Sequence, residues 1–493
     1  MSETRKPFFH RCFLRLTETA CVLGLLLGSA FPVHASFDAE LALEINRGLP
    51  VQSNEVPNWP AGPAIGAESA ILIEAQTGTI LYAKNIHQRE YPASTTKILT
   101  TLIATERCQM DEIVSFSHDA VFDTPRDSSH IAMDVGQELT MEQCLNAILI
   151  RSANEVSYAV AEHITGTTDW QVFAGIMNER AAELGCQDSH FANPNGLPDD
   201  DHYTSAYDLA MIGKAFFANE MLCKITLSRR MEFPATDKLP MGKLEVNHMQ
   251  IVPGGSYAYE YLVGCKTGYT DDARSCLVSC AEKDGLKLIC VVMRDESPNH
   301  YEDTISLFEY GFSNFERVNV AQTETKYNID NTGLFYSGND IFGSSRPFLS
   351  LNKEDFIVLP RTIPFEEVSS SISYEAADES QAAVISYSYQ EVPLGTVRVD
   401  FNADSQEPSI FDMEGEERAA APDQNDGDDS VIFVNVRFLL IGAAVLAGLL
   451  LLWLIVHLIL KNYNFSPRSG RRGWRKRNRH RRRGSRKHRG PDF

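Results

Sequence analysis

The sequence predicts an α/β protein in which an antiparallel sheet takes strands from both ends of one domain, with an all-helical segment between them. Two short runs rich in apolar and β-branched residues come first, at residues 69–74 and 79–83. Apolar residues then recur at helical spacing over much of residues 140–218, and β-rich runs return after Tyr261. Strands, then helices, then strands indicate that early and late strands share one sheet.

Residues 1–35 have the features of a secretory signal peptide. A basic segment comes first, an apolar run follows, and Val33-His34-Ala35 fits a cleavage site of small residues. We expect a cleaved signal rather than an uncleaved anchor, because the apolar run is short. Residues 36–63 form a polar, proline-containing lead-in to the folded domain.

A hairpin and a helix are the first predicted elements of the domain. Ser69–Glu74 and Thr79–Ala83 are separated by a short turn, which predicts an antiparallel pair. Ser94 lies at the start of the following helix, and Lys97 shares its face because residues three apart are neighbours on a helix. The apolar positions that would bury this helix are Ile98, Leu99, Leu102 and Ile103.

The helical segment follows a stretch at 107–139 that we expect to be irregular. Thr140 and Gln143 form a capping-box pattern at the start of a helix. That helix stops at Ser152-Ala153-Asn154, and the next begins at once. The boundaries of the later helices are marked by Gly166, Asp169, Gly185, Ser205 and Ala218.

Strand patterns return in the last part of the domain, which we place at residues 64–315. Arg274–Glu282 and Lys287–Arg294 read as a second hairpin, and Thr304–Asn314 reads as a helix with an apolar face. Lys266-Thr267-Gly268 lies on the strand that enters this hairpin.

Three further segments complete the predicted organisation. Short β-branched runs at 316–404 indicate a small all-β domain, and the acidic residues 405–430 indicate a disordered stalk. Residues 431–460 are almost wholly apolar and long enough for one transmembrane helix. The basic tail at 461–493 should lie in the cytoplasm by the positive-inside rule. Everything between the signal peptide and this helix is therefore expected outside the cell membrane.

Charge limits the partners of the chain. The formal net charge is −21 although the tail is strongly basic, so the remainder is even more acidic. Such a body would not bind nucleic acid or an anionic surface by net charge. For the tail, contact with anionic lipid is favoured and no nucleic acid is expected. Cysteines from Cys108 to Cys290 either pair or stay buried thiols, and the sequence leaves both open.

Three short motifs together indicate serine chemistry. A serine hydroxyl is a weak nucleophile, and a desolvated lysine one helical turn away can accept its proton. Ser94-x-x-Lys97 is followed by Ser152-Ala153-Asn154 and then by Lys266-Thr267-Gly268. Each motif alone is common, but this order and this placement are typical of β-lactamases and penicillin-binding proteins.

The flanking residues make the resemblance closer. The chain resembles the low-molecular-weight penicillin-binding proteins, the serine D-alanyl-D-alanine carboxypeptidases, which implies a penicillin-binding-protein/β-lactamase-like transpeptidase fold. The β segment resembles that family's C-terminal domain more loosely. The residues that carry the similarity are Tyr91–Lys97, Phe191–Leu197, His202–Thr204 and Gly264–Thr270.

The resemblance implies catalytic roles. Ser94 would attack the carbonyl between two D-alanines of a peptidoglycan stem pentapeptide and form an acyl-enzyme, and Lys97 would take its proton. Ser152 would relay a proton to the leaving amine. The backbone N–H groups of Ser94 and Tyr269 would form the oxyanion hole. β-Lactam antibiotics would act as inhibitors by acylating the same serine.

The resemblance also implies substrate-binding roles for Asn154, Lys266, Thr267, Gly268 and Tyr269. Asn154 would bind the substrate amide or hold the catalytic lysine. Lys266 would supply positive charge, and Thr267 would help to hold the terminal carboxylate. Neither a zinc-ligand spacing nor a glycine-rich phosphate loop occurs, so no cofactor and no metal are expected.

Two positions depart from the family pattern, and two alternatives stay open. Arg274 stands where many relatives have glycine, and His300 stands where some have an arginine that helps to bind carboxylate; either could replace that arginine. A β-lactamase is the enzymatic alternative, although the loop at 191–203 lacks the glutamate that such an enzyme uses for deacylation. The other alternative is a non-catalytic wall-binding or sensor protein of the same fold.

Overall fold

The computed structural model describes residues 38–326, 349–374 and 381–401. Within these ranges, we find no helix that is long and apolar enough to span a membrane. Four predicted segments lie outside the described residues: the signal peptide (1–35), the stalk (405–430), the membrane span (431–460) and the basic tail (461–493).

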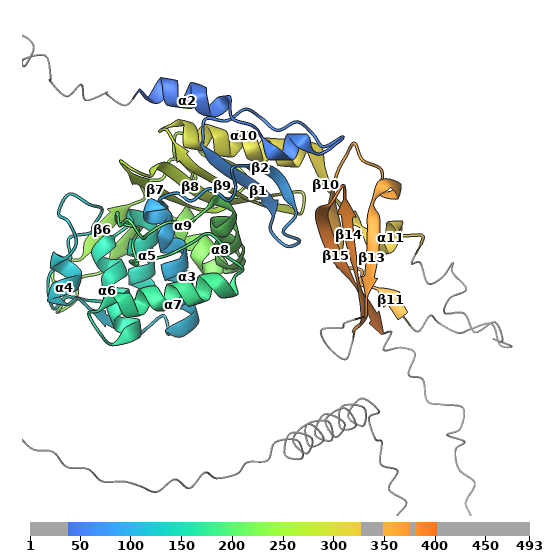
Figure 1. Ribbon diagram of the computed structural model, residues 1–493. Coiled ribbons are helices and arrows are strands. Elements are labelled where there is room, and N and C mark those ends of the chain that lie inside the picture. The colour runs from blue at the N-terminus through green and yellow to red at the C-terminus, as the bar shows by residue number, and fades with distance from the viewer. Residues whose placement is uncertain (1–37, 327–348, 375–380, 402–493) are drawn as a thin grey trace, which may run out of the picture. The chain divides into compact units, whose positions relative to one another are not determined.

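The central element is an antiparallel sheet with the strand order β2-β1-β9-β8-β7 (Figure 1). Its strands are β1 (Ser69–Glu74), β2 (Ile80–Lys84), β7 (Leu262–Thr270), β8 (Arg274–Lys283) and β9 (Leu286–Asp295). Strand β1 pairs with β2 on one side and β9 on the other, so strands from the two ends of the domain meet inside the sheet. This arrangement confirms the predicted α/β fold with an antiparallel sheet and a helical insert.

Helices cover both faces of the sheet (Figure 1). Ile71 and Ile73 of β1 pack into the core shared with the helical segment. Ala70 and Leu72 point to the other face, where α10 (Asn299–Asn314) supplies Phe308 to a second core. Burial on both faces explains why β1 is apolar almost throughout. The short N-terminal helices are α2 (Ala39–Arg47) and the 3-10 helix η1 (Gln52–Glu55).

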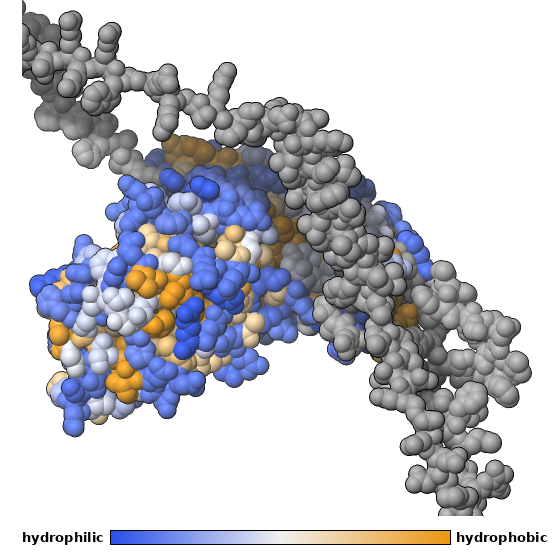
Figure 2. Space-filling view, turned by 60° about the horizontal axis from the view of Figure 1, so that its bottom comes forward, coloured by the Kyte–Doolittle hydropathy of each residue, from blue (hydrophilic) through white to orange (hydrophobic). Residues whose placement is uncertain are grey.

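The helical segment lies on one face of the sheet, and the surface seen in Figure 2 is mostly hydrophilic with scattered hydrophobic areas. The Thr140 hydroxyl accepts from the Gln143 N–H, and the Gln143 side chain accepts from the Thr140 N–H, which confirms the capping box. The helices are α3 (Lys97–Arg107), α4 (His118–Phe122), α5 (Met141–Arg151), α6 (Asn154–Thr165), α7 (Trp170–Glu183), α8 (Ala206–Ala218) and α9 (Glu220–Leu227).

The stretch expected to be irregular, 107–139, contains short regular elements, so that expectation was wrong in part. Strand β3 (Ile113–Ser115) pairs with β4 (Glu138–Thr140), although 22 residues separate their facing ends. Later, β5 (Arg230–Phe233) pairs with β6 (Lys243–Val246). Strands of three or four residues are too short for a periodic signal, so tertiary pairing decides them.

After α10, the residues that the structure describes are mainly in strands. Strand β10 (Phe315–Asn319) pairs with β12 (Phe356–Pro360), and a second sheet has the order β11-β15-β14-β13. The remaining elements are α11 (Val320–Thr323), β11 (Leu349–Leu351), the 3-10 helix η3 (Phe365–Glu367), β13 (Ser369–Ser373), β14 (Gln381–Tyr389) and β15 (Val392–Phe401). The predicted domain boundaries at 315 and 404 stay predictions.

Candidate active site

Ser94 lies in the 3-10 turn η2 (Ala93–Thr96), directly before α3. The residue before it, Ala93, has a positive φ of 47°, a conformation that costs a non-glycine residue about 1–3 kcal/mol. Such strain persists only where the surroundings hold it, and here it turns the chain sharply into the helix. The Lys97 Nζ lies 2.9 Å from the Ser94 Oγ, so the structure brings the two predicted residues into contact.

The Lys97 amine has two fixed acceptors besides Ser94. Its Nζ lies 2.7 Å from the Asn154 Oδ1 and 2.6 Å from the Asn195 backbone oxygen. Both oxygens only accept, so a neutral amine donates its two N–H groups to them. The lone pair of the nitrogen then faces the Ser94 hydroxyl, as a general base requires. Burial, reinforced by the nearby positive charge of Lys266, holds the Lys97 pKa well below the usual lysine value.

The loop that carries Asn195 is held against η2 by close packing. Gly196 has a φ of 82°, and a Cβ added there would stand 1.8 Å from the Ala93 backbone oxygen. The Asn193 Oδ1 accepts from the Gly196 N–H at 2.7 Å, which fixes the turn. The Thr100 hydroxyl donates to the Pro194 oxygen from the helix side. These contacts hold the Phe191–Leu197 motif so that the backbone oxygen of Asn195 accepts a hydrogen bond from Lys97.

Ser152 ends α5 in a left-handed conformation, with a φ of 59°. The turn places the Ser152 Oγ 3.1 Å from the Lys266 Nζ, which reaches across from β7. Lys266 also donates to the Thr267 oxygen at 2.6 Å and is fully buried. Burial lowers the Lys266 pKa to about 7. Each of the two serines therefore has a buried lysine beside it.

A cavity of about 720 Å³ opens in front of these serines. Ser94, Ser152 and Asn154 line it, whereas the two lysines lie buried behind their serines. The other predicted residues on its wall are Thr267, Gly268 and Tyr269 of β7. The structure thus gathers all the predicted site residues around one cavity, although their individual roles stay predictions.

Strand β7 runs directly against the nucleophile turn. A Cβ added to Gly268 would stand 2.9 Å from the Ser94 nitrogen and 2.8 Å from the Pro92 oxygen. Only glycine permits this approach, which brings the backbone of β7 at Gly268 beside that of Ser94. The proposed oxyanion hole needs such closeness, because its second N–H belongs to the next residue, Tyr269. The Tyr269 side chain itself is 56% exposed at the cavity mouth, where its hydroxyl lies 3.1 Å from an Asp271 oxygen.

Arg274 and His300, the two positions that depart from the family pattern, differ in their surroundings. The Arg274 guanidinium forms a bidentate ion pair with Glu296, at 2.6 and 2.8 Å. His300 lines the cavity and is 5% exposed, and within the described residues its Nδ1 has no hydrogen-bond partner. Burial lowers the His300 pKa to about 4, so the empty site holds a neutral imidazole.

Sequence reasoning missed His248, which also lines the cavity. Its Nδ1 lies 3.0 Å from the Ile150 oxygen, so Nδ1 carries the proton. The neutral ring then accepts from the Thr267 hydroxyl through Nε2, at 3.3 Å. Burial and the charge of Lys266 lower the His248 pKa to about 4. A lone histidine 18 residues before Lys266 gives no motif in the sequence.

Known proteins share this sequence and this fold. Residues 56–297 match the Peptidase S11 family, described as D-alanyl-D-alanine carboxypeptidase. The D-alanyl-D-alanine carboxypeptidase DacF of Bacillus subtilis is 34% identical over 257 residues, which are 51% of this chain and 63% of that protein. The DacA enzyme of Escherichia coli K12 is 29% identical over 315 residues, which are 61% of this chain and 73% of that protein.

A solved structure agrees on the fold. Penicillin binding protein 5 from Haemophilus influenzae aligns with a TM-score of 0.53 and 23% identity, covering 69% of this chain and 98% of that one. The sequence matches point to the same family as the three motifs around the cavity, and this structural likeness shows the fold. Over residues 56–297, the chain is similar to the Peptidase S11 family of D-alanyl-D-alanine carboxypeptidases.

Proposed function

We propose that the chain is a serine D-alanyl-D-alanine carboxypeptidase that removes the terminal D-alanine from peptidoglycan stem peptides. One observation carries the proposal: Lys97 is buried, and both of its other contacts are acceptors, so its lone pair faces Ser94. The names and identities of the relatives support the same activity.

The first half-reaction forms an ester on Ser94. Lys97 accepts the hydroxyl proton while Ser94 Oγ bonds to the carbonyl carbon of the penultimate D-alanine. Negative charge develops on the carbonyl oxygen, beside the backbone N–H groups of Ser94 and Tyr269. The C–N bond then breaks. The leaving amine takes a proton through Ser152, which lies within hydrogen-bond reach of Lys266, and D-alanine departs.

The second half-reaction returns the serine. Lys97 first passes the proton that it took from Ser94 to Lys266, which supplied the leaving amine, so both lysines are restored. Water then attacks the ester carbon and gives a proton to Lys97, and this proton passes to the Ser94 Oγ as the ester C–O bond breaks. The shortened peptide leaves as a carboxylic acid that loses its proton to solvent. A β-lactam would stop at the ester, because its opened ring stays attached and no leaving group vacates the cavity.

The terminal carboxylate of the substrate needs donors on the β7 side of the cavity. We assign this role to the Thr267 hydroxyl with His300, and not to Arg274, since the Arg274 guanidinium is engaged by Glu296. The Thr267 hydroxyl would turn its proton from the His248 Nε2 to the carboxylate. A carboxylate beside His300 would raise the pKa of this buried imidazole and so favour the charged, donating form.

The domain is further proposed to act outside the cell, held by a transmembrane helix at 431–460 with the basic tail inside. Strands β10 to β15 would be the small all-β domain between the peptidase and the stalk. Protease treatment of intact cells that express the chain should remove the peptidase domain and leave the tail protected. Protection of the peptidase domain would overturn this topology.

The activity has a direct test. The purified chain should release D-alanine from a peptide ending in D-Ala-D-Ala, and its intact mass should rise by one penicillin after treatment. Ser94→Ala should abolish both signals. Absence of D-alanine and of an adduct in the wild type would overturn the proposal, and rapid turnover of a chromogenic cephalosporin would favour the β-lactamase alternative.

A further inference from the structure

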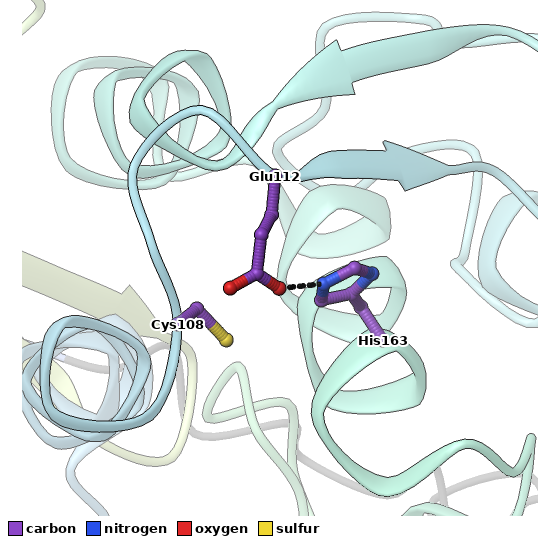
Figure 3. A group of neighbouring side chains, drawn as sticks. All are labelled: Cys108, Glu112 and His163. Atoms are coloured by element: carbon purple, nitrogen blue, oxygen red, sulfur yellow. Dashed lines mark hydrogen bonds and ion pairs between the residues drawn. The ribbon is translucent and has the colours of Figure 1, made fainter.

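Three side chains that can bind metal ions converge at the end of α3 remote from the nucleophile. Cys108 follows the last residue of α3, Glu112 lies in the next turn, and His163 lies in the last turn of α6. Figure 3 shows the Glu112 carboxylate between the other two side chains. The sulfur, one carboxylate oxygen and one ring nitrogen all lie within 4.8 Å of one another.

The backbone around these residues is already fixed. The Gln109 N–H donates to the Glu112 Oε1 at 2.6 Å, so the second carboxylate oxygen points to His163. The His163 Nε2 lies 2.8 Å from that oxygen. The Glu112 oxygen of the main chain accepts from the Met141 N–H, which ties the turn to α5. A metal ion at this point would therefore bind side chains whose positions are already held by hydrogen bonds.

The set of ligand atoms suits a tetrahedral zinc ion. Zinc takes thiolate, imidazole and carboxylate ligands at about 2.0–2.3 Å, which puts neighbouring ligand atoms about 3.4–3.7 Å apart. The histidine and glutamate atoms would separate by less than about 1 Å, and the sulfur would close in by a similar amount. The Glu112 and His163 side chains are partly exposed, so an ion can enter from their side and a water molecule can be the fourth ligand.

We propose that Cys108, Glu112 and His163 bind a divalent transition-metal ion of the zinc class. Binding releases the thiol proton of Cys108 and uses neutral His163 and anionic Glu112, so the ion's two charges are balanced by two ligand charges. No short sequence motif announces the site, because His163 lies 51 residues after Glu112 and only the fold brings them together.

The position of the ion gives it a structural role. Helix α3 begins with Lys97 and α6 begins with Asn154, and these two residues are in contact at 2.7 Å. Cys108 and Glu112 follow the opposite end of α3, about 16 Å from Lys97 along the helix axis. His163 lies in the last turn of α6. The ion would cross-link the ends of the two helices that carry the catalytic lysine and its partner, outside the cavity.

Cobalt(II) is the probe, because a thiolate–cobalt bond gives a charge-transfer absorption that oxygen and nitrogen ligands do not. The full chain, reduced and stripped of metal with a chelator, is titrated with Co²⁺ and then with Zn²⁺. We expect one equivalent of Co²⁺ to produce the band and Zn²⁺ to remove it. Added Zn²⁺ should also raise the Tm, since it binds the folded state.

Matched variants locate the site. Cys108→Ser should lose the band, and His163→Gln should weaken Co²⁺ binding at least tenfold. Cys186→Ser, at another half-buried cysteine, should keep both the absorption band and the affinity for Co²⁺. All three variants should still be acylated by penicillin, which shows that they fold. No band in the wild type, or a band that survives in Cys108→Ser, would overturn the proposal and leave a metal-free His163–Glu112 pair.

Discussion

Gly268→Ala tests how closely β7 must approach the nucleophile. The added methyl carbon would stand 2.8 Å from the Pro92 oxygen and 2.9 Å from the Ser94 nitrogen. Carbon makes its best contacts at about 3.5–4.0 Å, so β7 and η2 must separate by about 0.6 Å or more. Both sides of the clash are backbone, so no side-chain rotation relieves it.

Moving β7 away from η2 would widen the proposed oxyanion hole, whose two N–H groups belong to these two segments. A misplacement of about 1 Å at a reacting centre can cost about 100-fold in rate. For about 0.6 Å, we expect acylation to slow by about 10- to 100-fold, which corresponds to about 1.4–2.7 kcal/mol in activation free energy. Overpacking should also lower the stability of the fold by about 1–3 kcal/mol.

The assay is the second-order rate of acylation by penicillin, followed by the intact mass of the protein. Gly264→Ala is the matched control, because it lies on the same strand but its Cβ would meet the side chains of Thr226 and Phe217. The control should lose stability without slowing acylation. If Gly268→Ala acylates within about threefold of wild type, the close approach of β7 is not needed for the chemistry.

Three further predictions concern titrating groups. Lys97→Arg should abolish acylation without unfolding, since arginine keeps its proton; a near-normal rate would exclude Lys97 as the base. In the wild type, acylation should rise with pH as Lys97 loses its proton, at a midpoint below the usual lysine value of about 10.4, and fall as Lys266 loses its charge near pH 7. Lys266→Arg should keep part of the activity and lose the falling limb, and pH–rate profiles of the wild type and of Lys266→Arg check this. Burial raises the Glu90 pKa to about 7, so the folded state holds more protons than the unfolded chain from about pH 4.5 to 7, and stability falls as pH rises through that window. Glu90→Gln should flatten that part of the curve in urea unfolding, and an unchanged slope would contradict the assignment.

The strongly patterned parts of the fold could be predicted from the sequence. The first hairpin, the capping box at Thr140 and the helix break at Ser152 are local signals, and each is present in the structure. Helix α9 (Glu220–Leu227) follows α8 with a single residue between them, and its start depends on Asn219, which also ends α8. A single residue that serves two helices leaves no loop signal, so the second helix was not anticipated.

In the site, too, the sequence predicts the contacts that depend on local spacing and misses those that depend on tertiary packing. Ser94 and Lys97 are three residues apart, so helical geometry alone predicts their contact. The oxygen of Asn195 and the ring of His248 reach the site through tertiary packing, and a backbone carbonyl has no residue type that marks it in a sequence. Resemblance supplied the motif around Asn195 but not the atom that acts.

In the proposed mechanism, each of the two buried lysines acts on a different serine. Both lie fully buried, and burial disfavours their charged forms. The charge on Lys266 further lowers the pKa of Lys97, so a charged Lys266 favours the neutral Lys97 amine. When Lys266 carries the charge, the neutral Lys97 amine can accept the Ser94 proton. Ser152 lies against the charged Lys266, which can supply a proton to the leaving amine. In the proposed mechanism, one proton that moves between the two lysines would therefore serve both half-reactions without a histidine.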